Sequence, residues 1–316
     1  MTVHIRPATT SADLAALADL VNEVTPEDPS SMEEMRWSDA TYPGGARFLA
    51  TLEARVVGAA TVGRIYVFPP DHPELWWSAV VRGDARRRGV GSALLYHVTA
   101  HARDMGKTGL QCRAWEHRPE GIEFLVNRGF RELERARMVS LDLTGLPLPA
   151  IGQPPGISLT TLADRPDLIV GVHAVALEAF DDIPGGDTPM AAGDLGEFRA
   201  RDVDRPGIPP DGFMIAIDQA TDEVVGYASL MLRPGSTTVA WHDMTAVLRA
   251  WRGCGIATAL KRSTIDWAIR HGLSALETGN DEDNAGMRAV NARLGYRPLP
   301  DELTMRGPLL LTGVRA

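Results

Sequence analysis

Residues 80–95 read VVRGDARRRGVGSALL, and residues 246–261 read AVLRAWRGCGIATALK. Each stretch contains an arginine, two further residues, a glycine, one residue, and then a glycine or an alanine. The arginines that begin these motifs are Arg86 and Arg252, which lie 252 − 86 = 166 positions apart. Self-similarity at a fixed spacing indicates an internal repeat, which decides the architecture before any single element is considered.

Two further landmarks support the repeat. Residues 127–130 read NRGF and residues 293–296 read RLGY, and these strings also lie 166 positions apart. Upstream, VGAA at 57–60 resembles VGYA at 225–228 at a spacing of 168, which indicates a net length change of two residues before the arginine motif. Three landmarks in one order predict two copies of one unit.

The copies are separated by a proline-rich stretch. Residues 144–156 read TGLPLPAIGQPPG, and this composition favours an extended connector over a helix or a central strand. A chain of 316 residues is long enough for two domains. We therefore expect an N-terminal domain over 1–145, a linker over 146–156 and a C-terminal domain over 157–316.

Both copies predict the same order of elements. A short strand precedes a helix, two strands follow, a fourth strand runs directly into the arginine motif and a second helix, and a fifth strand, a helix and final strands complete the copy. Strands that alternate with helices indicate a mixed α/β sheet. The expected strands are 47–52, 56–67 and 109–115 in the first copy and 157–159, 213–217, 224–232 and 274–278 in the second, with helices at 14–21 and 168–180.

Composition excludes several classes of protein. The 32 Lys and Arg against 41 Asp and Glu give a net charge of −9, which disfavours a nucleic-acid partner held by phosphate neutralisation. No stretch approaches the roughly 18 apolar residues of a membrane span, and the N-terminus lacks the apolar region of a secretion signal. Two cysteines are too few for a disulfide framework. We expect a soluble, cytoplasmic protein with no membrane partner.

The arginine motif predicts a phosphate site. Glycine or alanine at the point where a strand turns into a helix lets a ligand approach the backbone, and the first-turn amides have no partner inside the helix. The helix dipole places positive charge at the same end, so a diphosphate suits this site. The loop lacks the lysine of a nucleotide-binding P-loop and the glycine fingerprint of a dinucleotide site.

Both copies resemble the GNAT superfamily of acetyl-CoA-dependent N-acetyltransferases. The resemblance rests on a fourth strand that ends in valine, on the arginine motif, and on a helix that begins with Asn284 and closes on Leu-Gly-Tyr; the first copy is looser there, with Arg118 in place of the asparagine. Two tandem copies resemble the mycothiol synthase-like, two-domain members from actinobacteria. The resemblance implies a mostly antiparallel sheet in each domain, whose fourth and fifth strands separate to admit the pantetheine arm.

The resemblance also assigns cofactor-binding residues, with acetyl-CoA as co-substrate and no metal. They are Val81, Arg86, Arg87, Arg88, Gly89, Val90 and Gly91 in the first copy, and Val247, Arg252, Gly253, Cys254, Gly255, Ile256, Ala257 and Asn284 in the second.

The second copy keeps polar groups where the first does not. At the offset of 166, Asp243 is expected to correspond to Trp77, and Asn291 to Leu125. A protonated amine must lose a proton before it attacks a thioester, so Asp243 is the candidate base. Asp243 is equally compatible with two other roles, a structural carboxylate or an anchor for the substrate ammonium group. Because side chains alternate along a strand, only one of His242 and Asp243 can face the cleft.

One residue departs from the family pattern. Many members place a tyrosine four residues before the glycine of Leu-Gly-Phe, where it protonates the departing thiolate, but Asn291 stands there. Asparagine donates a hydrogen bond but no proton at neutral pH. Tyr296 at the Phe position is expected to pack in the core. Asn291 is therefore a candidate site residue, transfer is expected to depend largely on positioning, and the leaving-group acid is left unassigned.

The sequence predicts an N-acetyltransferase with a catalytic C-terminal copy and a non-catalytic N-terminal copy, which either binds CoA or acts as a structural partner. The acetyl group would move from acetyl-CoA to a primary amine, on a small molecule or a peptide, directly in a ternary complex. The acidic segment 181–187 is expected either near the acceptor site or as an exposed loop. The alternative is a non-catalytic acyl-CoA-binding or sensing protein. We expect a monomer with pseudo-dimeric halves or a homodimer.

Overall fold

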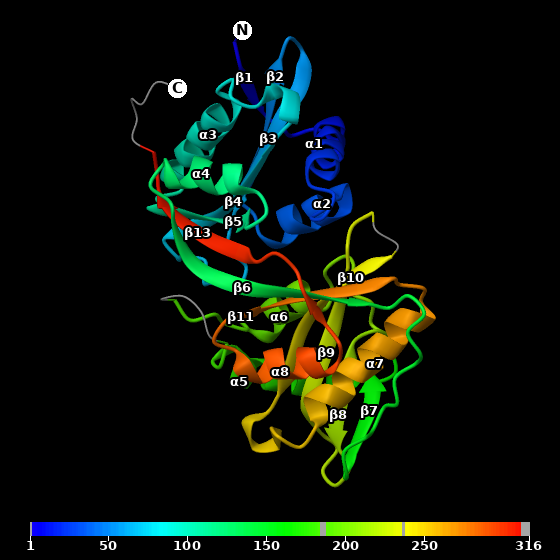
Figure 1. The fold of residues 1–316 in the computed structure, drawn as a ribbon. Coiled ribbons are helices and arrows are strands. Elements are labelled where there is room, and N and C mark those ends of the chain that lie inside the picture. Colours follow the sequence, from blue (N-terminus) through cyan, green and yellow to red (C-terminus); the bar gives the residue numbers. More distant parts are fainter. Residues whose placement is uncertain (1, 184–187, 236–237, 311–316) are drawn as a thin grey trace. The chain divides into compact units, whose positions relative to one another are not determined.

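The computed structural model describes residues 2–183, 188–235 and 238–310 (Figure 1). The chain forms two compact units. The N-terminal unit contains the chain up to Arg135 together with the segment that begins at Glu302, and the C-terminal unit is Ala136–Asp301. In the described residues, no helix has the length and apolar character needed to cross a membrane.

The N-terminal unit is a sheet with helices on its faces. Its sheet has the order β1-β2-β3-β4-β5-β13, with the start of β6 beside β13. The strands are β1 (His4–Pro7), β2 (Ala46–Leu52), β3 (Arg55–Gly63), β4 (Glu74–Val81), β5 (Gly109–Trp115), β6 (Arg131–Asp142) and β13 (Glu302–Pro308). The helices are α1 (Ser11–Val24), α2 (Met32–Thr41), α3 (Val90–Asp104) and α4 (Pro119–Val126).

The C-terminal unit repeats this plan. Its sheet has the order β6-β11-β10-β9-β8-β7, and β12 pairs with the other edge of β6. The strands are β7 (Ile157–Thr161), β8 (Met214–Asp218), β9 (Glu223–Leu232), β10 (Val239–Val247), β11 (Ala275–Asp281) and β12 (Arg297–Pro298). The helices are α5 (Ile169–Phe180), α6 (Leu195–Asp202), α7 (Ile256–Arg270) and α8 (Ala285–Arg293).

Both sheets are mixed and mostly antiparallel, which confirms the expected fold class. Parallel pairing joins β4 to β5 and β10 to β11, and the other registered pairs are antiparallel. The strand at 109–115 has the expected bounds, and the strand expected at 56–67 ends earlier, at Gly63.

The compact units do not coincide with the sequence halves. In β6, residues Ala136–Asp142 pair with β11 of the C-terminal unit, and β13 pairs along its whole length with β5 of the N-terminal unit. Residues 136–145 therefore fall outside the N-terminal unit expected at 1–145, and the segment from Glu302 falls outside the C-terminal domain expected at 157–316. The cause is backbone pairing between residues far apart in sequence, which local patterns do not reveal. Residues 146–156 contain no helix or strand, as expected of a linker.

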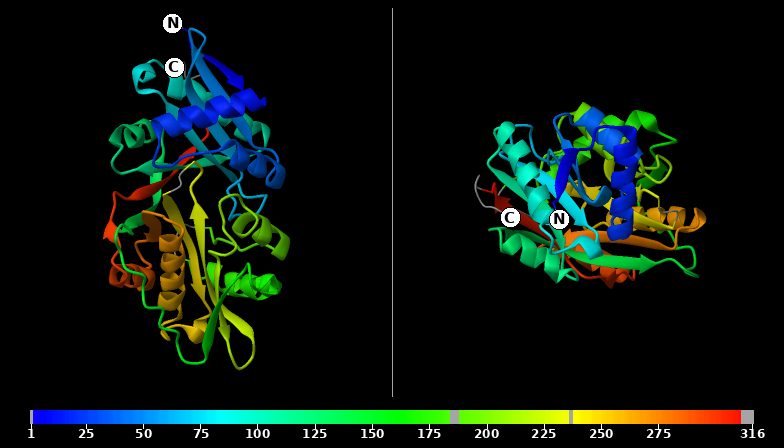
Figure 2. Two further views of the ribbon diagram at one scale, coloured as in Figure 1. Left: turned by 90° about the vertical axis from the view of Figure 1, so that its right-hand side faces the viewer. Right: turned by 90° about the horizontal axis from the view of Figure 1, so that it is seen from above.

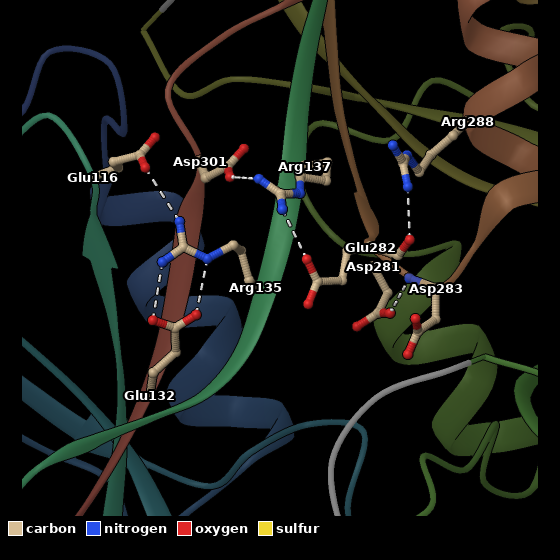
Figure 3. A network of polar contacts seen from close by, with 9 residues as sticks. All are labelled: Glu116, Glu132, Arg135, Arg137, Asp281, Glu282, Asp283, Arg288 and Asp301. Carbon is tan, nitrogen blue, oxygen red and sulfur yellow. Dashed lines mark hydrogen bonds and ion pairs between the residues drawn. The ribbon is translucent and has the colours of Figure 1, made fainter.

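Ion pairs connect the exchanged strands to other parts of their units. In the N-terminal unit, Arg306 of β13 pairs with Glu74 of β4 at 2.9 Å, and both side chains are mostly buried. Arg135 and Arg137 of β6 belong to different compact units, and each forms ion pairs within its own unit (Figure 3). Arg135 binds Glu132 and Glu116 in the N-terminal unit, whereas Arg137 binds Asp301 and Glu282 in the C-terminal unit.

Each sheet separates two groups of helices. In the C-terminal unit, α7 lies on one side of the strands and α5 and α6 lie on the other (Figure 2, left). The helix that follows each arginine motif buries one apolar face, as its 3.6-residue spacing predicts. Val90, Leu94 and Val98 of α3, and Ile256 and Leu260 of α7, are at most 1% exposed.

Candidate active site

The arginine motifs adopt the same backbone conformation in both copies. Gly89 caps the N-terminus of α3 with φ +83°, and Gly255 caps α7 with φ +85°, a left-handed conformation that suits glycine. Two residues earlier, Arg87 and Gly253 also have positive φ, at +61° and +78°. The loops therefore have one shape, and in the first copy an arginine takes a conformation that the second copy gives to glycine.

These loops leave backbone amides available at the helix N-termini. No side chain caps α3 or α7, whereas Thr10 and Ser31 cap α1 and α2. A Cβ added at Gly89 or Gly253 would meet no atom within 4 Å, so the space above both loops is open. Arg87, Arg88, Gly253 and Cys254 are exposed in these loops, while the side chains of Val90 and Ile256 are buried below them. The site can accept an anionic group through its amides.

The leading arginine of each motif is already bound within the protein. Arg252 donates to the Val247 carbonyl at 3.1 Å and to Asp182 at 2.6 Å, and Arg86 donates in the same way to the Val81 carbonyl and to Glu120. The guanidinium groups of Arg249 and Arg252 lower the pKa of Asp182 to about 2. Asp182 thus anchors the loop, while residues 184–187 of the acidic segment lie outside the described residues.

The fourth and fifth strands separate in both units, as the resemblance implied. β4 pairs with β5 from Glu74↔Gly109 to Trp76↔Gln111, and β10 pairs with β11 from Val239↔Ala275 to Trp241↔Glu277. No registered pair joins these strands further along. A gap in the hydrogen-bonding ladder therefore opens toward the arginine motif.

A β-bulge distinguishes the second copy from the first. The register of β10 with β9 shifts between His242 and Thr245, whereas the pairing of β4 with β3 runs without a shift. Asp243 lies in this bulge. A bulge re-aims side chains and is common beside active sites.

The bulge corrects the expected match between Asp243 and Trp77. His242 lies opposite Leu230 in the same register as Trp77 opposite Val62, so His242 is the counterpart of Trp77. The packing agrees, because the Trp77 and Phe130 rings are 6.0 Å apart at 50° and the His242 and Tyr296 rings are 6.5 Å apart at 50°. The offset of 166 fails here because the bulge adds one residue to β10.

Asp243 faces the α5–α6 side of the sheet. Ser229 of β9 donates a hydrogen bond to its carboxylate at 3.5 Å. Burial raises the pKa of Asp243, although Arg205 and Arg201 favour the charged form. Burial also raises the pKa of Asp202, at the end of α6, to about 6, and the negative charge of Asp243 adds to this shift. A second carboxylate that the sequence did not reveal therefore lies near the candidate base.

His242 faces the opposite side and is fully buried. Its ring nitrogens lie 3.0 Å from the Tyr296 hydroxyl and 3.1 Å from the Thr264 hydroxyl. The expectations that His242 and Asp243 face opposite ways, and that Tyr296 packs in the core, are both confirmed.

The two asparagines have different surroundings. Asn284 caps α8 by accepting a hydrogen bond from the Met287 amide, at the end of a turn in which Asp281 accepts from the Asp283 amide (Figure 3). Asn291 is 2% exposed, and its amide nitrogen donates to Asn280 of β11 at 2.6 Å. The sequence motifs did not point to Asn280, because it lies outside the arginine motif and outside the helix that closes on Leu-Gly-Tyr.

Unsatisfied polar atoms lie on the strands and helix that border the gap. Two of the buried side-chain atoms that have no hydrogen-bond partner in the described residues, Asn291 Oδ1 and Thr245 Oγ1, belong to these elements. Buried polar groups are normally paired, so these atoms fit a ligand with amide groups, such as the pantetheine arm of acetyl-CoA. At the positions that correspond to Thr245, Asn280 and Asn291, the N-terminal unit has Ala79, Ala114 and Leu125, which have no polar side-chain atom. In the described residues, no group of three or more His, Cys, Asp or Glu side chains is arranged to hold a metal ion.

Comparison with known families agrees with this geometry. The model of the acetyltransferase (GNAT) family matches residues 14–130 and 178–296, which is more than half of the chain. The chain therefore belongs to the GNAT family of acetyltransferases, which use acetyl-CoA as co-substrate.

The chain is similar to curated proteins named mycothiol acetyltransferase. It is 26% identical to the protein of Streptomyces coelicolor over 93% of this chain and 90% of that protein, and 26% identical to that of Amycolatopsis mediterranei over 81% and 82%. It is 27% identical to the protein of Renibacterium salmoninarum, but the match spans only 62% of that protein's length and 69% of this chain.

A solved structure shares the fold. A tandem GNAT protein from the clavulanic acid biosynthesis pathway has a TM-score of 0.77 and 24% identity, over 98% of this chain and 100% of that chain. The tandem architecture expected from the repeat is thus confirmed.

Proposed function

We propose that the C-terminal unit transfers an acetyl group directly from acetyl-CoA to a primary amine, with Asp243 as the base. The bulge in β10 is the observation that carries this proposal. It is present in β10 and absent from the register of β4, and it places a carboxylate beside the gap between two strands.

Different residues of the C-terminal unit would bind the cofactor, accept the proton and border the acceptor. The amides of Gly255, Ile256 and Ala257 would hold the diphosphate, and Thr245 and Asn291 would bind the amides of the pantetheine arm. Asp243 accepts the proton that the amine must lose, and burial raises its pKa toward the range that a base needs at neutral pH. Ser229 and the α5–α6 side of the sheet would border the acceptor.

Direct transfer is favoured over an acetyl-enzyme intermediate. Of the two cysteines of the chain, Cys112 is buried in the N-terminal unit and Cys254 lies in the diphosphate loop. Neither lies at the bulge, so the thiol nucleophile that an intermediate would use has no candidate there.

The N-terminal unit would bind CoA without catalysis. Its loop has the same shape and carries three arginines, but β4 has no bulge, and Leu125 replaces the asparagine of α8. With this division, the protein would be a monomer with two unequal, pseudo-dimeric halves or a homodimer of such chains.

The acceptor would be a small molecule or a peptide with a primary amine. Similarity to proteins named mycothiol acetyltransferase supports an acetyl-transfer reaction. We place the enzyme in the cytoplasm, where its two unpaired cysteines would stay reduced.

The proposal is tested with Asp243→Asn and with Ser78→Ala as control. Ser78 occupies the unbulged counterpart position in β4 and is exposed. Release of free thiol from acetyl-CoA is measured over a panel of amines, and acetyl-CoA affinity is measured by calorimetry. We expect Asp243→Asn to lower kcat by about 10² to 10⁴ with unchanged affinity, and the control to keep full turnover.

Two results would contradict the proposal. Undiminished turnover in Asp243→Asn would remove Asp243 from the mechanism. Binding of acetyl-CoA by the wild-type protein without thiol release on any amine would favour the alternative, a non-catalytic binding or sensing protein.

A further inference from the structure

A layer of buried polar side chains lies on the α7 side of β10. His242 is hydrogen-bonded to Tyr296 through one ring nitrogen and to Thr264 through the other. The amino group of Lys261 lies 5.3 Å from the centre of the Tyr296 ring. Each of these four side chains is at most 4% exposed.

The N-terminal unit fills the same layer with apolar side chains. Trp77 is the counterpart of His242, and Leu95, Val98 and Phe130 correspond to Lys261, Thr264 and Tyr296. They are at most 3% exposed, so both layers are core. The fold therefore forms without a polar layer, and a buried lysine costs stability. A chemical role in the C-terminal unit would account for the buried lysine.

Lys261 has no anionic partner among the residues that the structure describes. Within the described part of the chain, neither a carboxylate nor a hydrogen-bond acceptor pairs with its amino group. Burial lowers the pKa of Lys261 to about 7, because the charged form loses its hydration. The groups that surround it are His242 from β10, Tyr296 from the segment after α8 and Thr264 from α7, while β8 and β9 present apolar core residues to this helix.

The position of this layer is defined by the strand gap. His242 follows Trp241, the last residue of β10 that pairs with β11, so the layer begins where the strands separate. A helical side chain leans toward the N-terminus of its helix, and Lys261 therefore leans toward the loop at Gly255. Asp243 faces the opposite side of the sheet. A base and a titratable amine thus flank the start of the gap.

We propose that Lys261 is the acid that protonates the departing thiolate of CoA. The proposal rests on the proposed function, which places the thioester at the gap. The acceptor nitrogen forms a bond to the acetyl carbon and gives up a proton on the Asp243 side. The carbon–sulfur bond breaks, its electron pair stays on sulfur, and sulfur takes a proton from the Lys261 ammonium group. The neutral amine regains a proton from solvent.

This assignment explains the missing tyrosine. Asn291 stands where many family members have the acid and delivers no proton. Lys261 would reach the sulfur from the adjacent helix, and its perturbed pKa lies near that of a thiol, as an efficient acid requires.

The first test compares Lys261→Met, Lys261→Arg and the control Leu95→Met. Lys261→Met removes the proton, Lys261→Arg keeps a positive charge that does not deprotonate, and Leu95→Met changes the counterpart in the N-terminal unit. We expect both Lys261 variants to lose about 10² to 10⁴ in kcat with KM for acetyl-CoA within about threefold of wild type, and the control to keep its turnover. The fall of wild-type kcat above about pH 7 should be absent from Lys261→Met. Turnover within about threefold of wild type in either Lys261 variant would overturn the proposal.

The second test needs no acceptor. The Lys261 amino nitrogen is followed by ¹⁵N NMR from pH 5 to 10 with saturating CoA and, separately, with desulfo-CoA, and Lys261→Met assigns the signal. A thiolate beside the ammonium group should raise its apparent pKa with CoA relative to desulfo-CoA. Identical titrations would overturn the proposal.

The two tests distinguish failure of the proposed acetyl transfer from failure of Lys261 as the acid. Absence of thiol release by the wild-type protein on every amine, with a CoA-specific shift at Lys261, would overturn the proposed transfer and leave Lys261 at the sulfur. Thiol release that survives Lys261→Met would overturn the acid and leave the transferase intact.

Discussion

Single residues decide which copy of the repeat has a site. The loops of the two arginine motifs have the same backbone, and their leading arginines are held by Asp182 and by Glu120. The motif therefore gives both units the same loop shape. The polar side chains at Asp243, Asn280 and Asn291 are what distinguish the second copy.

The pairing of Arg252 with Asp182 predicts a gain of affinity when it is removed. Asp182→Asn should free positive charge at the loop and tighten CoA binding about two- to fivefold, an effect that weakens as salt rises. Glu120→Gln makes the same change at Arg86. Calorimetry at two ionic strengths measures both variants, and weaker binding in Asp182→Asn would mean that the ion pair shapes the loop.

The raised pKa of Asp243 predicts an acidic limb of activity. A base must be ionised, so kcat/KM should fall as pH drops through that pKa, at a midpoint above the usual aspartate value of about 4. Thiol release measured from pH 4 to 8 locates the midpoint. A profile that stays level down to pH 4 is incompatible with Asp243 as the base.

At the scale of elements, sequence patterns located most helices, most strands and both loops, because these depend on local periodicity and on glycine. They did not predict α2 or α6. They did not locate the bulge in β10. A bulge depends on how two strands pair, so a fixed offset matched Trp77 with Asp243 instead of with His242. Lys261 was detectable, because the offset of 166 places it opposite Leu95.

The contact of α7 with β10 predicts a cost for Thr264→Val. This variant has nearly the same shape but leaves the ring nitrogen of His242 buried without its partner, which costs about 1–3 kcal/mol. Urea unfolding measures the change, and Thr264→Ser, which keeps the hydroxyl, should recover part of it. A Thr264→Val protein as stable as wild type would show that the hydrogen bond contributes no net stability.

For the whole molecule, the main feature is the exchange of strands between sequence halves. β13 closes the N-terminal unit and the second half of β6 closes the C-terminal unit. Local sequence signals predicted a linker but gave no sign of this exchange, because pairing partners such as Met305 and Cys112 are almost 200 positions apart.

Strand exchange predicts the behaviour of separated halves. Fragments 1–145 and 157–316 should each expose an unpaired strand edge and aggregate or remain partly unfolded, because each lacks a strand of its unit. Co-expression should restore a soluble one-to-one complex. Size-exclusion chromatography with light scattering distinguishes the outcomes, and two well-folded, separate monomers would contradict the prediction.

The position of β13 also bears on how the protein is made. A ribosome that has released the first 145 residues has not yet synthesised the strand that pairs with β5. The edge of β5 therefore stays unpaired during more than half of translation. Ala136–Asp301, by contrast, is continuous in sequence and can close as soon as it emerges. Although domains generally fold in order of synthesis, here the half that is made first is the last to be completed.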